Sequence, residues 1–228
     1  MNPCKRKKEL NIKNIIFDLG GVLLNIDYNR TINAFKELGM TDFDNFFNQA
    51  AQSRLFDRLD KGTISPGDFR KELRAITGLN PTEHQIDQAW NAMLLDMPSK
   101  RVKLLQNVGK NYRTFLLSNT NAIHYPVYME YMSETFGVED LAHLFEKQYL
   151  SYQVGMRKPD KEIYENVVRE NELNPQQTLF IDDSSQHVIG ARLAGLKAIW
   201  LDVERFSVES LFNDDYKLKG VVRKMMQS

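Results

Sequence analysis

Four groups of residues in this sequence have side chains that could do chemistry, and each stands next to a short apolar run or a helix-like segment. They are Asp18, the run Ser118-Asn119-Thr120, Lys158 and the pair Asp182-Asp183. An aspartate can act as a nucleophile, and a hydroxyl or amide at a helix start can hold the oxygens of an anion. A lysine can neutralise negative charge, and adjacent carboxylates repel one another unless they are solvated, protonated or bound to a cation. Oxygen ligands with few histidines nearby favour Mg²⁺ over zinc.

Each group also has an ordinary structural explanation. Strand-end aspartates such as Asp18 often only cap the next loop, and Ser, Asn and Thr are common at helix N-caps. Lysines such as Lys158 are usually solvated at the surface, and Asp183 or Ser184 could cap the helix that follows. The chemical interpretation therefore depends on all four groups occurring together in one fold.

Short apolar runs that end in polar residues recur along the chain and predict buried parallel strands. They are 14–18, 114–118, 178–182 and 198–202, with a further strand near 147–152. Helix-like segments lie between them at 100–111, 122–135, 160–172 and 185–194. This alternation is typical of an α/β fold with a doubly wound parallel sheet. Open sheets of this kind carry their sites at the carboxyl ends of the strands, where Asp18, Ser118 and Asp182 stand.

The segment from residue 28 to residue 97 gives no strand signal and is predicted to be helical throughout. Its apolar residues recur at spacings of three and four, as in Ile32, Phe35 and Leu38. Turn signals such as Asp60-Lys-Gly62 divide it into short helices. We therefore expect a catalytic core from residues 1–27 and 98–228, and a small helical cap from residues 28–97 that closes over the sheet.

Composition and charge exclude several classes of protein. The 228 residues are 42% hydrophobic, and 30 basic residues balance 30 acidic ones, so we expect no nucleic-acid or anionic-membrane partner. The apolar runs are too short for a membrane span, and the lysine-rich start lacks the apolar run of a signal peptide. The single cysteine, Cys4, fits a reducing compartment, which favours a cytoplasmic protein. We expect a monomer or a weak homodimer.

Taken in order, the four groups resemble the motifs of the haloacid-dehalogenase superfamily. The matching runs are Ile15-Ile-Phe-Asp18-Leu-Gly-Gly21, Leu117-Ser118-Asn119, Arg157-Lys158-Pro159 and Ile181-Asp182-Asp183-Ser184. The resemblance covers residues 13 to about 202. It is strongest to small-molecule and sugar-phosphate phosphatases whose first motif reads Asp-Leu-Gly. It extends, at lower similarity, to the amino-terminal phosphatase domain of epoxide hydrolases.

The resemblance implies an enzyme with a Rossmann-like core that hydrolyses a small phosphorylated metabolite through a phosphorylated aspartate. Asp18 would be the nucleophile and Mg²⁺ the cofactor. The implied phosphate-binding residues are Ser118, Asn119 and Lys158. The implied metal ligands are Asp18, the backbone carbonyl of Gly20, Asp183 and, directly or through water, Asp182.

Gly20 departs from the family pattern, because most phosphatases of this family carry a second aspartate there as general acid and base. Losing a positioned proton donor typically costs about 10²–10⁴-fold in rate. Either another acid, such as Asp27 or a cap residue, reaches the site, or the leaving group departs without help. The second possibility favours sugar 1-phosphates, because an anomeric hydroxyl is more acidic than an ordinary alcohol.

Two other functions fit parts of the pattern. A site that lacks its acid could bind a phosphorylated ligand without turnover, as a regulatory protein would. A hydrolytic haloacid dehalogenase would share Asp18 and the Ser118-Asn119 pair but needs no metal. The adjacent carboxylates Asp182-Asp183 therefore favour phosphate over halide.

Overall fold

The computed structural model describes residues 11–40 and 52–226. The predictions that concern Cys4 and the lysine-rich start of the chain fall outside these ranges. Among the helices within them, none is both long enough and apolar enough to cross a membrane.

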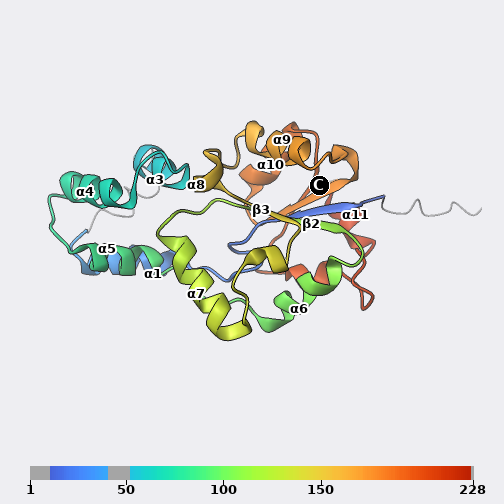
Figure 1. Cartoon of the computed structure of the whole chain (residues 1–228), viewed down its shortest axis with the longest axis horizontal. Helices are drawn as coiled ribbons and strands as arrows, with labels where there is room; N and C mark the ends of the chain where they lie inside the picture. The colour runs from blue at the N-terminus through green and yellow to red at the C-terminus, as the bar shows by residue number, and fades with distance from the viewer. Residues whose placement is uncertain (1–10, 41–51, 227–228) are drawn as a thin grey trace, which may run out of the picture.

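A five-stranded parallel sheet forms the centre of the molecule (Figure 1). Its strands are β1 (Asn14–Phe17), β2 (Arg113–Ser118), β3 (Lys147–Leu150), β4 (Thr178–Asp182) and β5 (Lys197–Trp200). Their order across the sheet is β3-β2-β1-β4-β5, so the chain starts in the middle and winds to either side. The predicted doubly wound α/β fold is confirmed.

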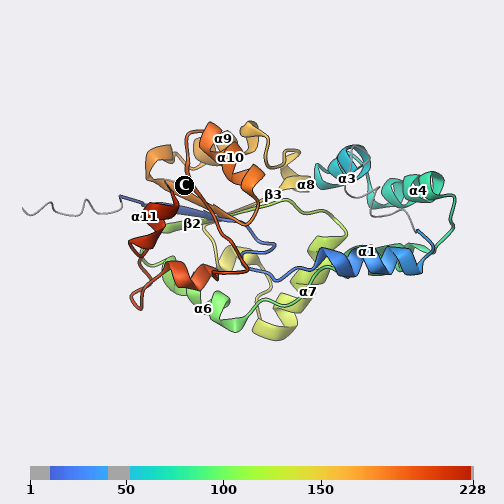
Figure 2. The same cartoon turned by 180° about the vertical axis from the view of Figure 1, so that it is seen from behind.

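Helices cover both faces of the sheet, because each strand alternates its side chains between two apolar layers. One layer includes Ile15 and Phe17 and packs against α6 (Ser99–Val108), α7 (His124–Phe136) and α11 (Val221–Met225). The other includes Ile16 and Phe180 and packs against α9 (Lys161–Glu170) and α10 (Ser185–Leu193). Figure 2 shows the two layers from behind. Shorter helical turns are α8 (Ser151–Val154), η1 (Leu141–His143), η2 (Pro175–Gln177) and η3 (Val208–Leu211).

A helical unit extends from one end of the sheet (Figures 1 and 2). It consists of α1 (Tyr28–Glu37), α3 (Gln52–Asp60), α4 (Pro66–Thr77) and α5 (Glu83–Asn91). The unit has its own apolar core, in which Phe35, Phe69 and Trp90 are buried. Side-chain caps begin three of its helices, at Asp27 for α1, at Ser65 for α4 and at Thr82 for α5. The helical prediction agrees with these four helices but is wrong for residues 94–97, where Leu94 forms an antiparallel bridge with Ile26.

The two connections between the helical unit and the sheet run antiparallel to one another. The Asn25 N–H donates to the Asp96 carbonyl at 2.8 Å, and the Leu95 N–H donates to the Asn25 carbonyl at 3.0 Å. The Asp27 N–H donates to the Met93 carbonyl at 2.9 Å. These bonds tie the entry and exit of the helical unit together beside the end of β1.

Some element boundaries differ from the sequence-based ones for local reasons. β1 ends at Phe17, so Asp18 is the first residue after the strand, and β5 ends at Trp200. The helix predicted from residue 122 begins at His124, because the Asn121 side-chain carbonyl accepts the N–H groups of the residues that open it. The local cap, and not the apolar pattern, therefore sets where α7 starts.

Candidate active site

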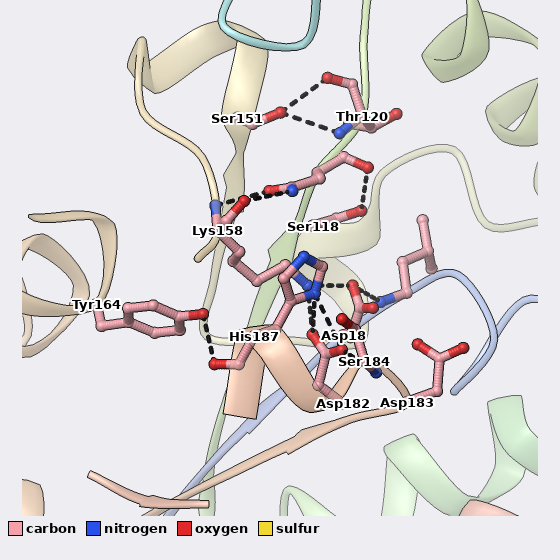
Figure 3. Close-up of polar contacts among 12 residues, drawn as sticks. Asp18, Ser118, Thr120, Ser151, Lys158, Tyr164, Asp182, Asp183, Ser184 and His187 are labelled. Carbon is pink, nitrogen blue, oxygen red and sulfur yellow. Dashed lines mark hydrogen bonds and ion pairs between the residues drawn. The ribbon is translucent and has the colours of Figure 1, made fainter. Parts of the chain in front are cut away.

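The three central strands bring Asp18, Ser118 and Asp182 together at the edge of the sheet that is formed by the carboxyl ends of its strands (Figure 3). Phe17 pairs with Leu116 of β2 and with Ile181 of β4, so the residues that follow emerge side by side. The Asp18 N–H donates to the Ile181 carbonyl at 3.0 Å, which continues the ladder one step beyond β1. All three polar side chains are almost completely buried at this edge.

Lys158 enters this group from the loop before α9, and its ammonium contacts two carboxylates. Nζ lies 2.7 Å from Asp18 Oδ1 and 2.6 Å from Asp182 Oδ2, and the side chain is completely buried. Asn119 fixes the loop, because its amide donates to the Lys158 carbonyl at 2.9 Å and accepts from the Lys158 N–H at 2.9 Å. Burial lowers the pKa of Lys158, but Asp18 and Asp182 outweigh this and raise the pKa above its usual value, so the ammonium stays charged.

Asp182 uses both carboxylate oxygens inside the protein. Oδ2 accepts from Lys158, and Oδ1 accepts from the Ser184 N–H at 2.8 Å and lies 3.0 Å from His187 Nδ1. Burial raises the pKa of Asp182, but Lys158 and His187 outweigh this and hold the pKa below its usual range. His187 is a site residue that the sequence motifs did not predict, although a histidine in the first turn after a strand-end aspartate is an available signal.

Asp183 turns the other way, toward the loop that follows β1. A Cβ at Gly21 would lie 2.0 Å from Asp183 Oδ2, and Gly21 has a φ of +76°, so glycine is required on both counts. Burial and repulsion from Asp182 raise the pKa of Asp183 to about 6. Burial also raises the pKa of Asp18 well above its usual value, with Asp182 adding to the effect and Lys158 opposing it. Three carboxylates thus lie around one ammonium that contacts only two of them, and a further cation would relieve the excess charge.

Two groupings of donor atoms at the site could receive that cation. Asp18, Asp183 and Gly20 line the same cavity and offer carboxylate and carbonyl oxygens. Asp18, Asp182 and His187 also offer ligand atoms that lie within 4.8 Å of one another. However, the Lys158 ammonium already contacts both Asp18 and Asp182, so a metal ion there would meet a like charge. The first grouping is therefore the better candidate.

The loop after β2 presents Ser118 to the cavity and is anchored from behind. The Thr120 N–H donates to Ser151 Oγ at 3.0 Å, and that hydroxyl donates to the Thr120 carbonyl at 2.8 Å. Ser118 Oγ makes only a long contact, 3.5 Å, with the Asn119 carbonyl. Asn119, which we expected to hold phosphate oxygens, uses its side-chain amide to hold the Lys158 backbone. Its side chain is thus placed to position the lysine.

A cavity of about 730 Å³ lies between this edge of the sheet and the helical unit. Its core side is polar and includes Asp18, Ser118, Lys158 and Asp183. Its opposite side is largely apolar and includes Ile32, Phe56, Trp90 and Met93. Phe56 stacks on Trp90 at 4.8 Å between ring centroids, and Trp90 stacks on His124 at 5.0 Å. A hollow of about 790 Å³ at the amino ends of the strands contains none of the predicted site residues.

Residues that the sequence analysis did not assign to the site connect the cavity to the helical unit. Arg157, the neighbour of Lys158, forms an ion pair with Asp57 and lies 3.9 Å from Asp60 Oδ2. Asn121 Nδ2 donates to Asp60 Oδ1 at 3.0 Å, and Tyr28 lines the same cavity. These contacts join residues far apart in the chain, and a single sequence carries no signal for such pairings.

Comparisons with known proteins agree with this geometry. The D-ribitol-5-phosphate phosphatase of Bacteroides thetaiotaomicron is 35% identical over 185 residues, which cover 80% of this chain and 88% of that protein. The sesquiterpene phosphatase of Aspergillus oryzae is 26% identical over 190 residues, which cover 83% of this chain and 89% of that protein.

A solved structure and a family model extend the comparison. The crystal structure of a wild-type HAD family enzyme from Bacteroides thetaiotaomicron, in complex with magnesium and inorganic phosphate, matches with a TM-score of 0.78 and 34% identity. The match covers 89% of this chain and 100% of that chain. The model of haloacid dehalogenase-like hydrolases matches residues 12–195. The chain therefore belongs to the haloacid dehalogenase-like hydrolase family.

Proposed function

We propose that this protein is a Mg²⁺-dependent phosphatase that transfers the phosphoryl group of a small metabolite to Asp18 and then to water. The observation that carries this function is the buried cluster in which Asp18 and Asp182 share the Lys158 ammonium, with Asp183 nearby as a further negative charge. A phosphate dianion can approach an aspartate only where positive charge offsets their repulsion. The relatives named as phosphatases, and the related enzyme with magnesium and phosphate bound, support the same function.

The residues at the site fit Mg²⁺. Asp18, Asp183 and the Gly20 carbonyl supply the hard oxygen donors that this ion prefers. Burial raises the pKa of Asp183 and repulsion from Asp182 raises it further, and the ion would offset that repulsion. When bound, Mg²⁺ would supply positive charge to the phosphoryl oxygens and to Asp18. Asp182 is better assigned to Lys158, since both of its oxygens are already used, and it would reach the ion only through water.

The chain's own residues account for the two transfer steps. An Asp18 oxygen attacks phosphorus while the bond to the leaving oxygen breaks, and water later attacks the phosphorylated aspartate. Lys158, charged and held by Asp182 and by the Asn119 amide, stabilises the phosphoryl oxygens throughout. The Ser118 hydroxyl, buried and facing the cavity, is placed to donate to one of those oxygens.

The helical unit supplies the other half of the cavity, and this supports its role in substrate choice. We assign residues 28–97 to a cap and residues 1–27 and 98–228 to the catalytic core. D-ribitol 5-phosphate, the substrate named for the Bacteroides relative, supports a small polar phosphate ester here. The preference for sugar 1-phosphates stays a prediction, as do the cytoplasmic location and the monomeric or weakly dimeric state.

The two alternative functions make different use of the same site. A haloacid dehalogenase needs Asp18 and the loop after β2 but has no use for Asp183 against Gly21. A binding protein would retain phosphate without releasing product, which the missing acid at Gly20 allows. The phosphatase relatives favour turnover over both.

Phosphate release from a panel of phosphorylated metabolites, with and without Mg²⁺, tests the proposal. We expect release that requires Mg²⁺, stops with a chelator and is absent in Asp18→Asn. Asp27→Asn is the matched control: Asp27 N-caps α1 from the connection after β1, and asparagine keeps that cap. A protein that binds phosphate in the presence of Mg²⁺ but releases none from any ester would instead support the regulatory alternative.

A further inference from the structure

The proposed phosphatase needs a proton donor that its first loop does not supply. Gly20 has no side chain, and an alkyl ester such as D-ribitol 5-phosphate leaves as a strongly basic alkoxide unless its oxygen is protonated. An inference about this donor rests on the proposed function. It requires a carboxyl group that faces the same cavity as Asp18.

Asp27, one candidate from the sequence, is directed elsewhere. Its carboxylate accepts from the Asn29 N–H at 3.0 Å as the N-cap of α1 and lies 3.8 Å from Arg30. The side chain is 40% exposed, and Asp27 is not among the described residues that line the cavity. It is thus a surface helix cap.

Asp60, the last residue of α3, faces the cavity and is attached to the loop that carries Ser118. Its Oδ1 accepts from Asn121 Nδ2 at 3.0 Å, and Asn121 follows Ser118 by three residues. The turn after Asp60 packs on the core: Gly62 has a φ of +64°, and a Cβ there would lie 2.1 Å from the Tyr152 carbonyl oxygen. Contacts on both sides therefore hold Asp60 over the site.

The electrostatic surroundings of Asp60 favour a carboxyl that can both give and take a proton near neutrality. Its side chain is only 18% exposed, and burial raises the pKa of Asp60 to about 7, with the Asn121 hydrogen bond opposing. The charged and titratable groups around it are Arg157 from the core, Tyr28 from α1 and Asp57 on its own helix. Tyr28 lines the same cavity as Asp18, Asp60 and Asp183; burial raises the pKa of Tyr28, and these three carboxylates raise it further.

We propose that Asp60 is the general acid and base of this phosphatase, replacing the acid absent at Gly20. As the Asp18 oxygen bonds to phosphorus and the ester bond breaks, its electron pair goes to the leaving oxygen, which takes the Asp60 proton. The products of this step are the alcohol, the phosphorylated aspartate and the Asp60 carboxylate. Asp60 then takes a proton from the water that attacks phosphorus, and inorganic phosphate leaves as Asp18 is restored.

Leaving-group dependence distinguishes proton donation by Asp60 from a purely structural role. We compare D-ribitol 5-phosphate, whose alkoxide needs a proton, with 4-nitrophenyl phosphate, whose phenolate does not. Asp60→Asn should lower kcat/KM, which reports the first transfer alone, by about 10²–10⁴-fold on the alkyl ester, and its loss on the aryl ester should be at least about tenfold smaller. The matched control is Asp57→Asn, which removes a neighbouring carboxylate of the same helix and the same arginine. It should affect both esters alike.

The pH profile and a rescue variant test the same inference. In the wild type, kcat/KM on the alkyl ester should fall as pH rises through about 7, because protonated Asp60 is the form that acts in the first transfer, and Asp60→Asn should lack this limb. Asp60→Asn combined with Gly20→Asp should recover at least about tenfold on the alkyl ester. A Cβ at Gly20 would approach only the end of the flexible Ile26 side chain, at 3.3 Å, so the second change is accommodated.

The outcomes separate the two proposals. Equal losses on both esters in Asp60→Asn, or no loss on the alkyl ester, would overturn the role of Asp60 and leave the phosphatase function intact. If the wild type releases phosphate from neither ester or from any other metabolite in the panel, the phosphatase function fails and the role of Asp60 fails with it.

Discussion

Arg157 and Lys158 are neighbours in one loop, and each lies against two aspartates, but their surroundings differ. The Lys158 side chain has no exposure and contacts aspartates of the core, at 2.7 and 2.6 Å. The Arg157 side chain is 24% exposed and faces Asp57 and Asp60 of the helical unit. One residue thus completes the charge cluster of the sheet edge, and the next attaches the helical unit to it.

This difference determines what each ion pair can contribute. Water cannot reach a fully buried ion pair, so removal of Lys158 leaves the negative charges of Asp18 and Asp182 uncompensated. Arg157 is partly exposed, and water can hydrate it and its aspartates if the helical unit moves away, so its ion pairs contribute less to the free energy of unfolding. We therefore expect Lys158 to govern stability and chemistry, and Arg157 to govern the closed position of the helical unit.

The largest expected effect is the loss of turnover on substitution of Asp18, the proposed nucleophile that contacts Lys158. Asp18→Asn keeps the size of the side chain and its contacts but removes the nucleophilic charge. Turnover should fall by at least about 10⁴-fold, measured as phosphate release, while the fold, measured by circular dichroism, stays intact. Release at a rate near that of the wild type would exclude a covalent mechanism on Asp18.

Lys158→Met should remove the positive charge that holds Asp18 and Asp182 together at the sheet. The variant leaves two buried carboxylates unpaired, so the free energy of unfolding at pH 7 should fall by about 3–5 kcal/mol. The loss should be smaller at pH 5, because protonation relieves the unpaired carboxylates, and both kcat and phosphate affinity should decrease. Lys161→Met is the matched control, since Lys161 forms an exposed pair with Glu165. Similar stability losses in the two variants would contradict the distinction.

The strands and the site residues at their ends show how much of the fold and of the site the sequence could predict. Apolar runs predicted four of the strands, because each run is buried in the sheet and is followed by polar residues. The fifth, β3, agrees with the further strand expected near 147–152. The strand-end position of Asp18 placed it at the correct edge for the same reason. The opposite directions of Asp182 and Asp183 were not predictable, since they depend on Lys158 and Gly21, which come from other parts of the chain.

Arg157→Gln, which removes the ion pairs to the helical unit, should have a smaller effect on stability than Lys158→Met. The unfolding free energy should change by no more than about 1 kcal/mol, because both of its aspartates can be hydrated once the unit opens. KM should instead rise, by about tenfold, and hydrogen exchange in α3 should become faster, because the closed position is less populated. Unchanged exchange in α3 would mean that the remaining contacts, such as Lys61 with Asp160 at 2.8 Å and Asn121 with Asp60 at 3.0 Å, are enough to hold the helical unit closed.

A last expected effect concerns stability against pH, and it tests the surroundings of Asp60 independently of catalysis. Burial raises the pKa of Asp60 from 3.8 to about 7, so the folded protein binds this proton more tightly than the unfolded chain does. The resulting stabilisation is fully present below about pH 4 and is lost as pH rises through about 7. Its slope is at most about 1.4 kcal/mol for each pH unit, and Asp60→Asn, which has no proton to bind there, should lack it. Urea unfolding of both proteins at pH 5 and pH 8, with chelator present, should show the wild type losing more stability than the variant. Parallel losses would mean that Asp60 is hydrated in solution, and that the contacts with Asn121 and Arg157 do not keep the helical unit closed.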